Sequence, residues 1–93
     1  MSLEDLVTKY IASAEHALGT IKIADVNHNK DNVTKIIESA KAYLADAKYY
    51  RNQRKLEVSL TSVAYCEGLL DALRLLGAVK FEWPAKAKEE RER

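Results

Sequence analysis

The sequence predicts an all-α protein, an up-down-up antiparallel three-helix bundle with a short extended and charged C-terminal tail. Apolar residues recur at helical spacing in three successive segments, and two polar stretches separate these segments. Three glycines and one proline in 93 residues are too few for a turn-rich β fold. We expect the bundle to occupy residues 1–78, with helices at about 2–24, 32–51 and 56–76, and the strip and tail to occupy 79–93.

The first predicted helix has one apolar stripe, which begins at Leu3 and continues to Ala24. Ser2 and Asp5 form a weak capping box at its start, where acidic residues also suit the helix dipole. The polar stretch 25–32 should end this helix and supply the cap of the next one.

The connector 25–32 also imitates the beginning of a calcium-binding loop, because Asp or Asn stands at alternate positions. Lys30 occupies the position of the turn glycine, and Ile36 occupies that of the bidentate glutamate. We therefore predict a helix connector and no metal site.

The second and third predicted helices form an antiparallel hairpin, because only residues 52–55 separate them. The second helix has one apolar stripe between Val33 and Tyr50, and Gly77 is placed to end the third in a left-handed conformation. The third helix is apolar around most of its circumference, more than two neighbouring helices can cover. This pattern predicts a second contact surface on the third helix.

A ridge of small residues runs along the third helix at Ala64, Gly68 and Ala72. Glycine is unfavourable inside a helix, so the ridge indicates a place where another backbone approaches closely. Tight helix packing is the expected reason, and a ligand groove is the alternative.

Residues 79–83 alternate apolar and charged side chains, which predicts extended backbone. Two interpretations stay open for Phe81 and Trp83: they fold back over an open end of the bundle, or they form a docking strip. The candidate partner surface combines the third helix with this strip and consists of Leu69, Leu75, Val79, Phe81 and Trp83.

The residues that usually carry catalysis or bind metals are scarce. Cys66 falls among core positions, His16 projects toward solvent, and no two histidines have the spacing of a helical metal site. We predict no catalytic residues, no cofactor and no metal. Asp46 and Asp71 are expected to be solvated or ion-paired, with interhelical hydrogen bonding or a site role as the alternatives.

The formal net charge of +1 gives no general attraction to nucleic acid or to a membrane surface. One local segment is nevertheless basic and aromatic, and its cations could simply complement the dipole at a helix C-terminus. The alternative is a surface for single-stranded RNA, made of Lys48, Tyr49, Arg51, Arg54 and Lys55.

The segment 43–77 resembles the archaeal family called domain of unknown function 357. The recurring pattern of that family is matched here by Tyr43, Asp46, Tyr65, Gly68 and Asp71. Family members typically carry Gly-Asp in the hairpin turn, where this chain has Arg54-Lys55. The resemblance implies a short three-helix bundle from the cytoplasm of an archaeon, with no established activity and no catalytic residues to transfer.

These observations favour a non-enzymatic protein–protein interaction module, with a homodimer as one form of that interaction. An RNA-contacting accessory domain is the alternative. We expect no membrane span, because no apolar run reaches the length that one needs. A cytoplasmic location is what the resemblance to the family implies.

Overall fold

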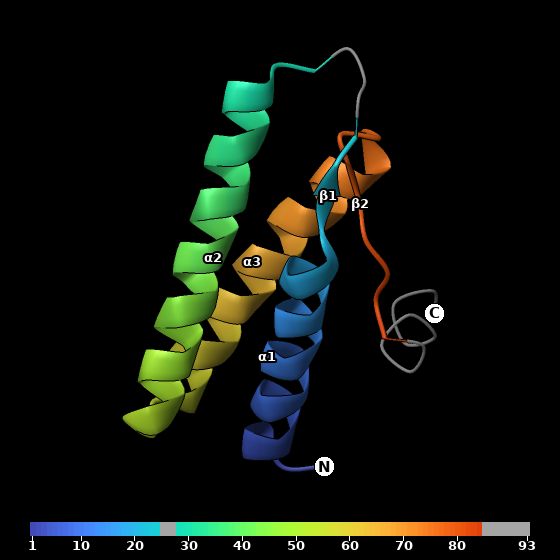
Figure 1. The fold of residues 1–93 in the computed structure, drawn as a ribbon. Helices are drawn as coiled ribbons and strands as arrows, with labels where there is room; N and C mark the ends of the chain where they lie inside the picture. The colour runs from blue at the N-terminus through green and yellow to red at the C-terminus, as the bar shows by residue number, and fades with distance from the viewer. Residues whose placement is uncertain (25–27, 85–93) are drawn as a thin grey trace.

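The computed structural model describes residues 1–24 and 28–84, which form three helices and a small two-stranded sheet (Figure 1). The elements in chain order are α1 (Leu3–Thr20), β1 (Lys22–Ile23), α2 (Lys30–Asn52), α3 (Leu56–Leu75) and β2 (Val79–Lys80). The helices run up, down and up, so the predicted all-α three-helix bundle is confirmed. Residues 25–27 of the connector and the charged tail from residue 85 onward lie outside the described residues.

The helix ends follow the predicted local signals. Ser2 and Asp5 form the capping box of α1, in which the Asp5 amide donates to Ser2 Oγ at 3.1 Å. Asn29 caps α2 by accepting from the Asn32 amide at 3.1 Å. Gly77 ends α3 with a φ of 76°, a left-handed conformation that glycine adopts without steric strain.

The first helix is shorter than predicted, because it ends at Thr20 and not at Ala24. The backbone turns extended at Ile21, and Lys22 and Ile23 then pair antiparallel with Lys80 and Val79. The apolar stripe of the helix continues through this segment, yet sheet pairing determines its conformation. Ile21 and Ile23 are β-branched and fit extended backbone well.

The core has α3 at its centre, since α3 packs against both α2 and α1, whereas α1 and α2 touch each other less. Figure 1 shows α2 and α3 close together at the hairpin turn and separating toward the end of the molecule that carries the sheet. The buried apolar residues come from all three helices and from the strip after α3: Val7, Ile11, Ala14, Ala17, Val33, Ile37, Ala40, Leu44, Ala47, Val63, Cys66, Leu70, Leu73, Ala78, Val79 and Trp83. Leu44, within the apolar stripe of the second helix, and Leu70 of α3 both belong to this core.

The strip after α3 belongs to the bundle, so a boundary at residue 78 does not separate it from the core. Val79 is 2% exposed and Trp83 is 6% exposed. Their placement on a partner surface was therefore a wrong prediction, and the alternative, in which the strip folds back over the bundle, is confirmed. The turn at Gly77 and the pairing of β2 with β1 return the chain along the helices, which buries alternate side chains.

The turn between α2 and α3 contains Arg54 with a φ of 61°, a left-handed conformation that disfavours residues with a Cβ. The buried Ser59 hydroxyl donates to the Ala47 carbonyl oxygen at 2.6 Å, which fixes the register of the two helices near this turn. The position of Arg54 explains why a glycine suits this turn.

Candidate functional site

The outer face of α3 is the largest departure from an ordinary helical surface. Its exposed large side chains are Val58 at 45%, Tyr65 at 54%, Leu75 at 77% and the capping residue Leu76 at 64%. Small exposed residues lie between them. We call the line of residues at alternating spacings of three and four along this face the α3 seam: Val58, Thr61, Tyr65, Gly68, Ala72 and Leu75. No residue of the α3 seam is charged.

The predicted small-residue ridge does not pack against another helix of the same chain. Ala64, Gly68 and Ala72 are all exposed, and a Cβ built on Gly68 meets no atom within 4 Å. The tight helix packing expected at this ridge is therefore not found within the described residues of the chain. The reason is that α1 and α2 both pack on the opposite side of α3, where Val63, Cys66 and Leu70 are buried.

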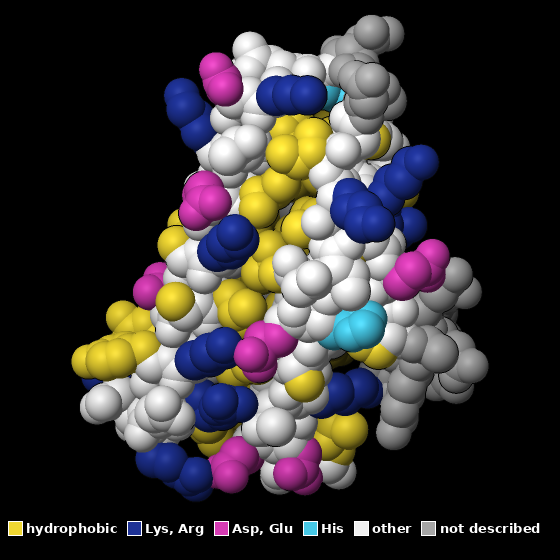
Figure 2. Space-filling model, in the orientation of Figure 1, with side chains coloured by type: hydrophobic (Ala, Val, Ile, Leu, Met, Phe, Trp, Pro, Cys, Tyr) yellow, Lys and Arg dark blue, Asp and Glu magenta, His cyan; other side chains and the backbone are white. Residues whose placement is uncertain are grey.

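The space between α1 and α2 is a different kind of surface. Figure 2 shows apolar side chains on the floor of this space. A smaller group of buried apolar residues joins α2, α3 and the start of the strip: Val33, Ile37, Leu73, Ala78 and Val79. Its α2 members Val33 and Ile37 are only 5% and 6% exposed.

The candidate partner residues outside the core differ in their exposure to solvent. Leu75 is exposed and belongs to the α3 seam. Leu69 and Phe81 are partly buried and pack against the core. Of the predicted surface, only Leu75 is thus fully presented to solvent.

The basic–aromatic segment is less basic in three dimensions than in sequence. Lys48 Nζ lies 2.8 Å from Glu15 Oε2 of α1, and Arg54 forms an ion pair with Glu4 of the same helix. Tyr49 is 59% exposed, as predicted. Within the part of the chain that the structure describes, Arg51 and Lys55 form no ion pair.

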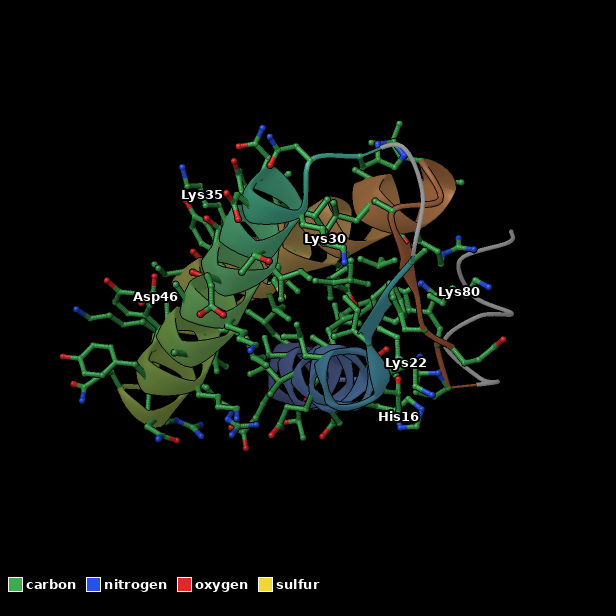
Figure 3. All side chains as sticks on the ribbon, turned by 45° about the horizontal axis from the view of Figure 1, so that its top comes forward. His16, Lys22, Lys30, Lys35, Asp46 and Lys80 are labelled. Carbon is green, nitrogen blue, oxygen red and sulfur yellow. The ribbon has the colours of Figure 1, made fainter. Side chains whose placement is uncertain are left out.

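Two of the residues that match the family pattern come into contact. The rings of Tyr43 on α2 and Tyr65 on α3 have centroids 4.4 Å apart. Asp46 is exposed on the outer side of α2, away from α1 (Figure 3). The contact between the two rings holds Tyr65 on the α2 side of the α3 seam.

Asp71 has a structural role that its sequence neighbours did not reveal. Its Oδ1 accepts a hydrogen bond of 2.9 Å from Trp83 Nε1, in addition to a 3.8 Å ion pair with Arg74. The expected ion pair between Asp71 and Arg74 within the helix is confirmed. The hydrogen bond that Asp71 accepts comes from the strip after α3 and not from another helix.

Cys66 and the histidines offer little chemistry. Burial, with a smaller contribution from the negative charge of Glu67, raises the pKa of the Cys66 thiol to about 12, so the thiol is not a nucleophile at neutral pH. His16 is exposed, and the His28 ring nitrogen Nε2 lies 3.0 Å from the Leu76 carbonyl oxygen. Among residues 1–24 and 28–84, no three His, Cys, Asp or Glu side chains group as metal ligands.

A charged groove at the sheet was not anticipated from sequence. It has a volume of about 660 Å³ and is lined by Thr20, Lys22, Arg74, Gly77, Val79, Lys80, Phe81 and Glu82. Lys22 and Lys80 are direct cross-strand partners, and Figure 3 shows both on the sheet beside the end of α1. Like charges placed opposite one another destabilise a strand pair. Only the strand register, which is a tertiary property, brings these lysines together.

One comparison with known proteins returned a match, to a protein family. Searches of curated proteins and of solved structures returned no match. Within the described residues, no helix has the combined length and apolar character needed to cross a membrane. The family described as "Protein of unknown function (DUF357)" matches residues 9–79, a range that includes α2, α3 and most of α1. The chain belongs to the DUF357 family.

Proposed function

We propose that this chain is a non-enzymatic protein–protein interaction module, which presents the α3 seam to an apolar surface of another protein chain. One observation carries the proposal: a 20-residue helix exposes a continuous line of side chains that contains no charge. Isolated apolar residues are normal on protein surfaces, but a contiguous apolar face marks an interaction site.

The exposure of the large side chains supports the same proposal. Leu75 and Leu76 are 77% and 64% exposed at the end of α3, and Tyr65, about three turns earlier on the same helix, is 54% exposed. Aromatic and large aliphatic side chains contribute most of the binding energy when a partner covers them. Thr61 adds no desolvation penalty of its own, because its hydroxyl already donates to the Glu57 carbonyl oxygen at 2.9 Å.

An enzymatic function has less support from the geometry. Asp46 is exposed, and Cys66 is fully buried and protonated at neutral pH. A nucleophile held next to a base is the usual sign of covalent catalysis. We also place the protein in the cytoplasm and in an archaeon, as the resemblance to the family implies.

The experiment compares two lysine substitutions at exposed positions. Leu75→Lys puts a charge on the α3 seam, and Ala45→Lys puts the same charge on the exposed side of α2. Two assays are used: sedimentation equilibrium for self-association, and retention of a native protein by the immobilised chain for binding to another protein. We expect Leu75→Lys to abolish whichever interaction the wild-type chain shows, and Ala45→Lys to leave that interaction unchanged. Identical behaviour of the two variants in both assays would contradict the proposal.

An RNA-contacting accessory domain is the second candidate. Its support is the 59% exposure of Tyr49, together with two cations nearby in sequence, Arg51 and Lys55, that form no ion pair among the residues that the structure describes. An exposed ring and available cations suit base stacking with phosphate contacts. The test is fluorescence anisotropy with mixed-sequence single-stranded RNA at low salt. Reversal of charge at Arg51 and Arg54 should abolish a salt-dependent signal, whereas Lys35→Glu, elsewhere on α2, should leave it unchanged. Absence of any low-salt binding by the wild-type chain would rule out this candidate.

A further inference from the structure

We propose that the charged groove at the sheet binds a small phosphate monoester. The residues that line this groove come from the end of α1, from both strands and from the end of α3, and none of them belongs to the α3 seam. The inference therefore goes beyond the proposed interaction function and does not depend on it.

Cations from three different elements line the groove. Lys22 lies on β1, Lys80 lies on β2, and Arg74 lies in the last turn of α3. Glu82 is the one acidic residue among the lining residues, so positive charge is in excess. Lys22 and Lys80 are direct cross-strand partners, whose side chains share one face of a sheet with Cβ atoms about 4.5–5.5 Å apart. Their ammonium groups can therefore contact the same bound anion.

The pairing of two lysines across the strands has a cost that an anion would remove. Both side chains are exposed, and neither forms an ion pair among residues 1–24 and 28–84. Like charges directly opposite one another destabilise a strand pair. Lysine on a short strand also discourages pairing with another chain, but that role does not explain why Arg74 of α3 lines the same groove. A bound anion explains all three cations.

The ion pair of Arg74 leaves its hydrogen-bond donors available to a ligand. Its Nε lies 3.8 Å from Asp71 Oδ1, which is longer than a hydrogen bond, and this oxygen already accepts from the Trp83 indole. Arginine offers phosphate oxygens two parallel N–H donors, whereas lysine contributes a point charge. A phosphate monoester carries about −1.5 to −2 charges at neutral pH, so it matches these cations better than a carboxylate does.

The groove also has room for the organic part of the ligand. Its volume of about 660 Å³ is within the range of small-molecule sites. Phe81 lines the groove and is only partly buried, and its ring is in edge-to-face contact with Trp83 at a centroid distance of 5.0 Å. An aromatic group attached to the phosphate can pack on the Phe81 ring. The geometry therefore points to a monoester with an aromatic body.

The first test is a titration of the isotope-labelled chain with phenyl phosphate at low salt, followed through backbone amide chemical shifts in NMR. We expect saturable shifts at residues 20–22 and 74–82, which contain the lining residues. Inorganic phosphate should shift the same amides with lower affinity, because it has no ring to contact Phe81. Shifts spread over exposed lysines of the whole surface would overturn the site, and equal affinities of the two ligands would overturn the contact with Phe81.

Two charge reversals provide a matched comparison. Lys22→Glu removes one cation of the groove, and Lys35→Glu makes the same change on the exposed side of α2. Lys22→Glu should weaken phenyl phosphate binding by about tenfold or more, because repulsion replaces a charge-assisted hydrogen bond, while Lys35→Glu should leave it unchanged. Lys22→Glu also relieves the like-charge pair, so a loss of binding would not reflect unfolding. A Lys22→Glu chain that binds as tightly as the Lys35→Glu chain would overturn the proposal.

The last arm separates a small ligand from nucleic acid. Mixed-sequence single-stranded RNA is added to the complex with phenyl phosphate at an equal concentration of phosphate. We expect the groove amides to stay at their ligand-bound positions. Displacement of phenyl phosphate by the RNA would assign the groove to nucleic acid and overturn the proposal. Either result leaves the interaction function intact, because Leu75→Lys tests a different surface.

Discussion

The indole Nε1 of Trp83 donates a hydrogen bond of 2.9 Å to Oδ1 of Asp71, which joins the strip after α3 to a position about one turn before the end of that helix. The Trp83 ring is 6% exposed and packs with the main core, in edge-to-face contact with Phe81 at a centroid distance of 5.0 Å. This bond holds the returning strip on the bundle, because a buried indole N–H without an acceptor would be costly.

We predict that Trp83→Phe destabilises the fold by about 1–3 kcal/mol, since it removes the indole donor and part of the buried ring. Urea denaturation followed by circular dichroism measures this loss. In a double-mutant cycle with Asp71→Ala, the two losses should fall short of additivity by about 0.5–3 kcal/mol. Strict additivity would mean that the two side chains stabilise the fold independently.

Two leucines on α3 provide a matched comparison of buried and exposed positions. Leu70 is 0% exposed and Leu75 is 77% exposed. Leu70→Ala should lower the free energy of unfolding by about 2–5 kcal/mol, whereas Leu75→Ala should change it by less than about 0.5 kcal/mol in dilute solution. Equal losses from thermal or chemical denaturation would refute the assignment of the two sides of α3.

Cys66 should make stability depend on alkaline pH. Its pKa is raised from 9.0 to about 12, first by burial and second by the charge of Glu67, so above pH 9 the unfolded chain releases a proton that the folded chain retains. The contribution of Cys66 to stability is therefore complete below pH 9 and is lost as pH rises toward 12, with a slope of up to about 1.4 kcal/mol per pH unit.

The measurement is urea denaturation of the wild-type chain and of Cys66→Val between pH 8 and about 11, a window set by the two thiol pKa values. The two proteins differ only at position 66, so the difference between the curves isolates the thiol. The two curves should diverge above pH 9; parallel curves would show that the thiol ionises equally easily in the folded chain.

Arg54 adopts a left-handed conformation, with a φ of 61°. Arg54→Gly should therefore stabilise the fold by about 0.5–1 kcal/mol when high salt screens the ion pair with Glu4. Arg54→Ala keeps the Cβ and loses the same ion pair, so it should give no such gain. A glycine variant no more stable than the alanine variant would show that the turn is unstrained.

The cross-strand pair Lys22 and Lys80 predicts a gain from charge reversal. Lys22→Glu should stabilise the fold by about 0.2–1 kcal/mol at low ionic strength, because a like-charge pair becomes an opposite-charge pair. The gain should decrease in high salt, and Lys35→Glu on the exposed side of α2 should not reproduce it. Denaturation at two salt concentrations makes the comparison, and a gain that ignores salt would argue against an electrostatic origin.

Sequence alone determined the three helices, their caps and their order. Ser2, Asn29 and Gly77 act through bonds and backbone angles within a few residues, so local signals were sufficient for them. The same is true of the apolar period that buries Leu44 and Leu70. The excess of apolar residues on α3 also predicted that two neighbouring helices would not cover all of them, and Leu75 is indeed 77% exposed.

Only the tertiary structure determined which residues from distant parts of the chain contact one another. Helical period cannot tell that the backbone leaves the helix at Ile21 to pair with β2, that Glu4 and Glu15 neutralise part of the basic segment, or that Trp83 reaches Asp71. These contacts join residues that are distant in the chain, so they depend on how the helices pack and on the strand register. For the same physical reason, sequence predicted a close approach at Gly68, but only the fold showed that its own chain leaves that position open.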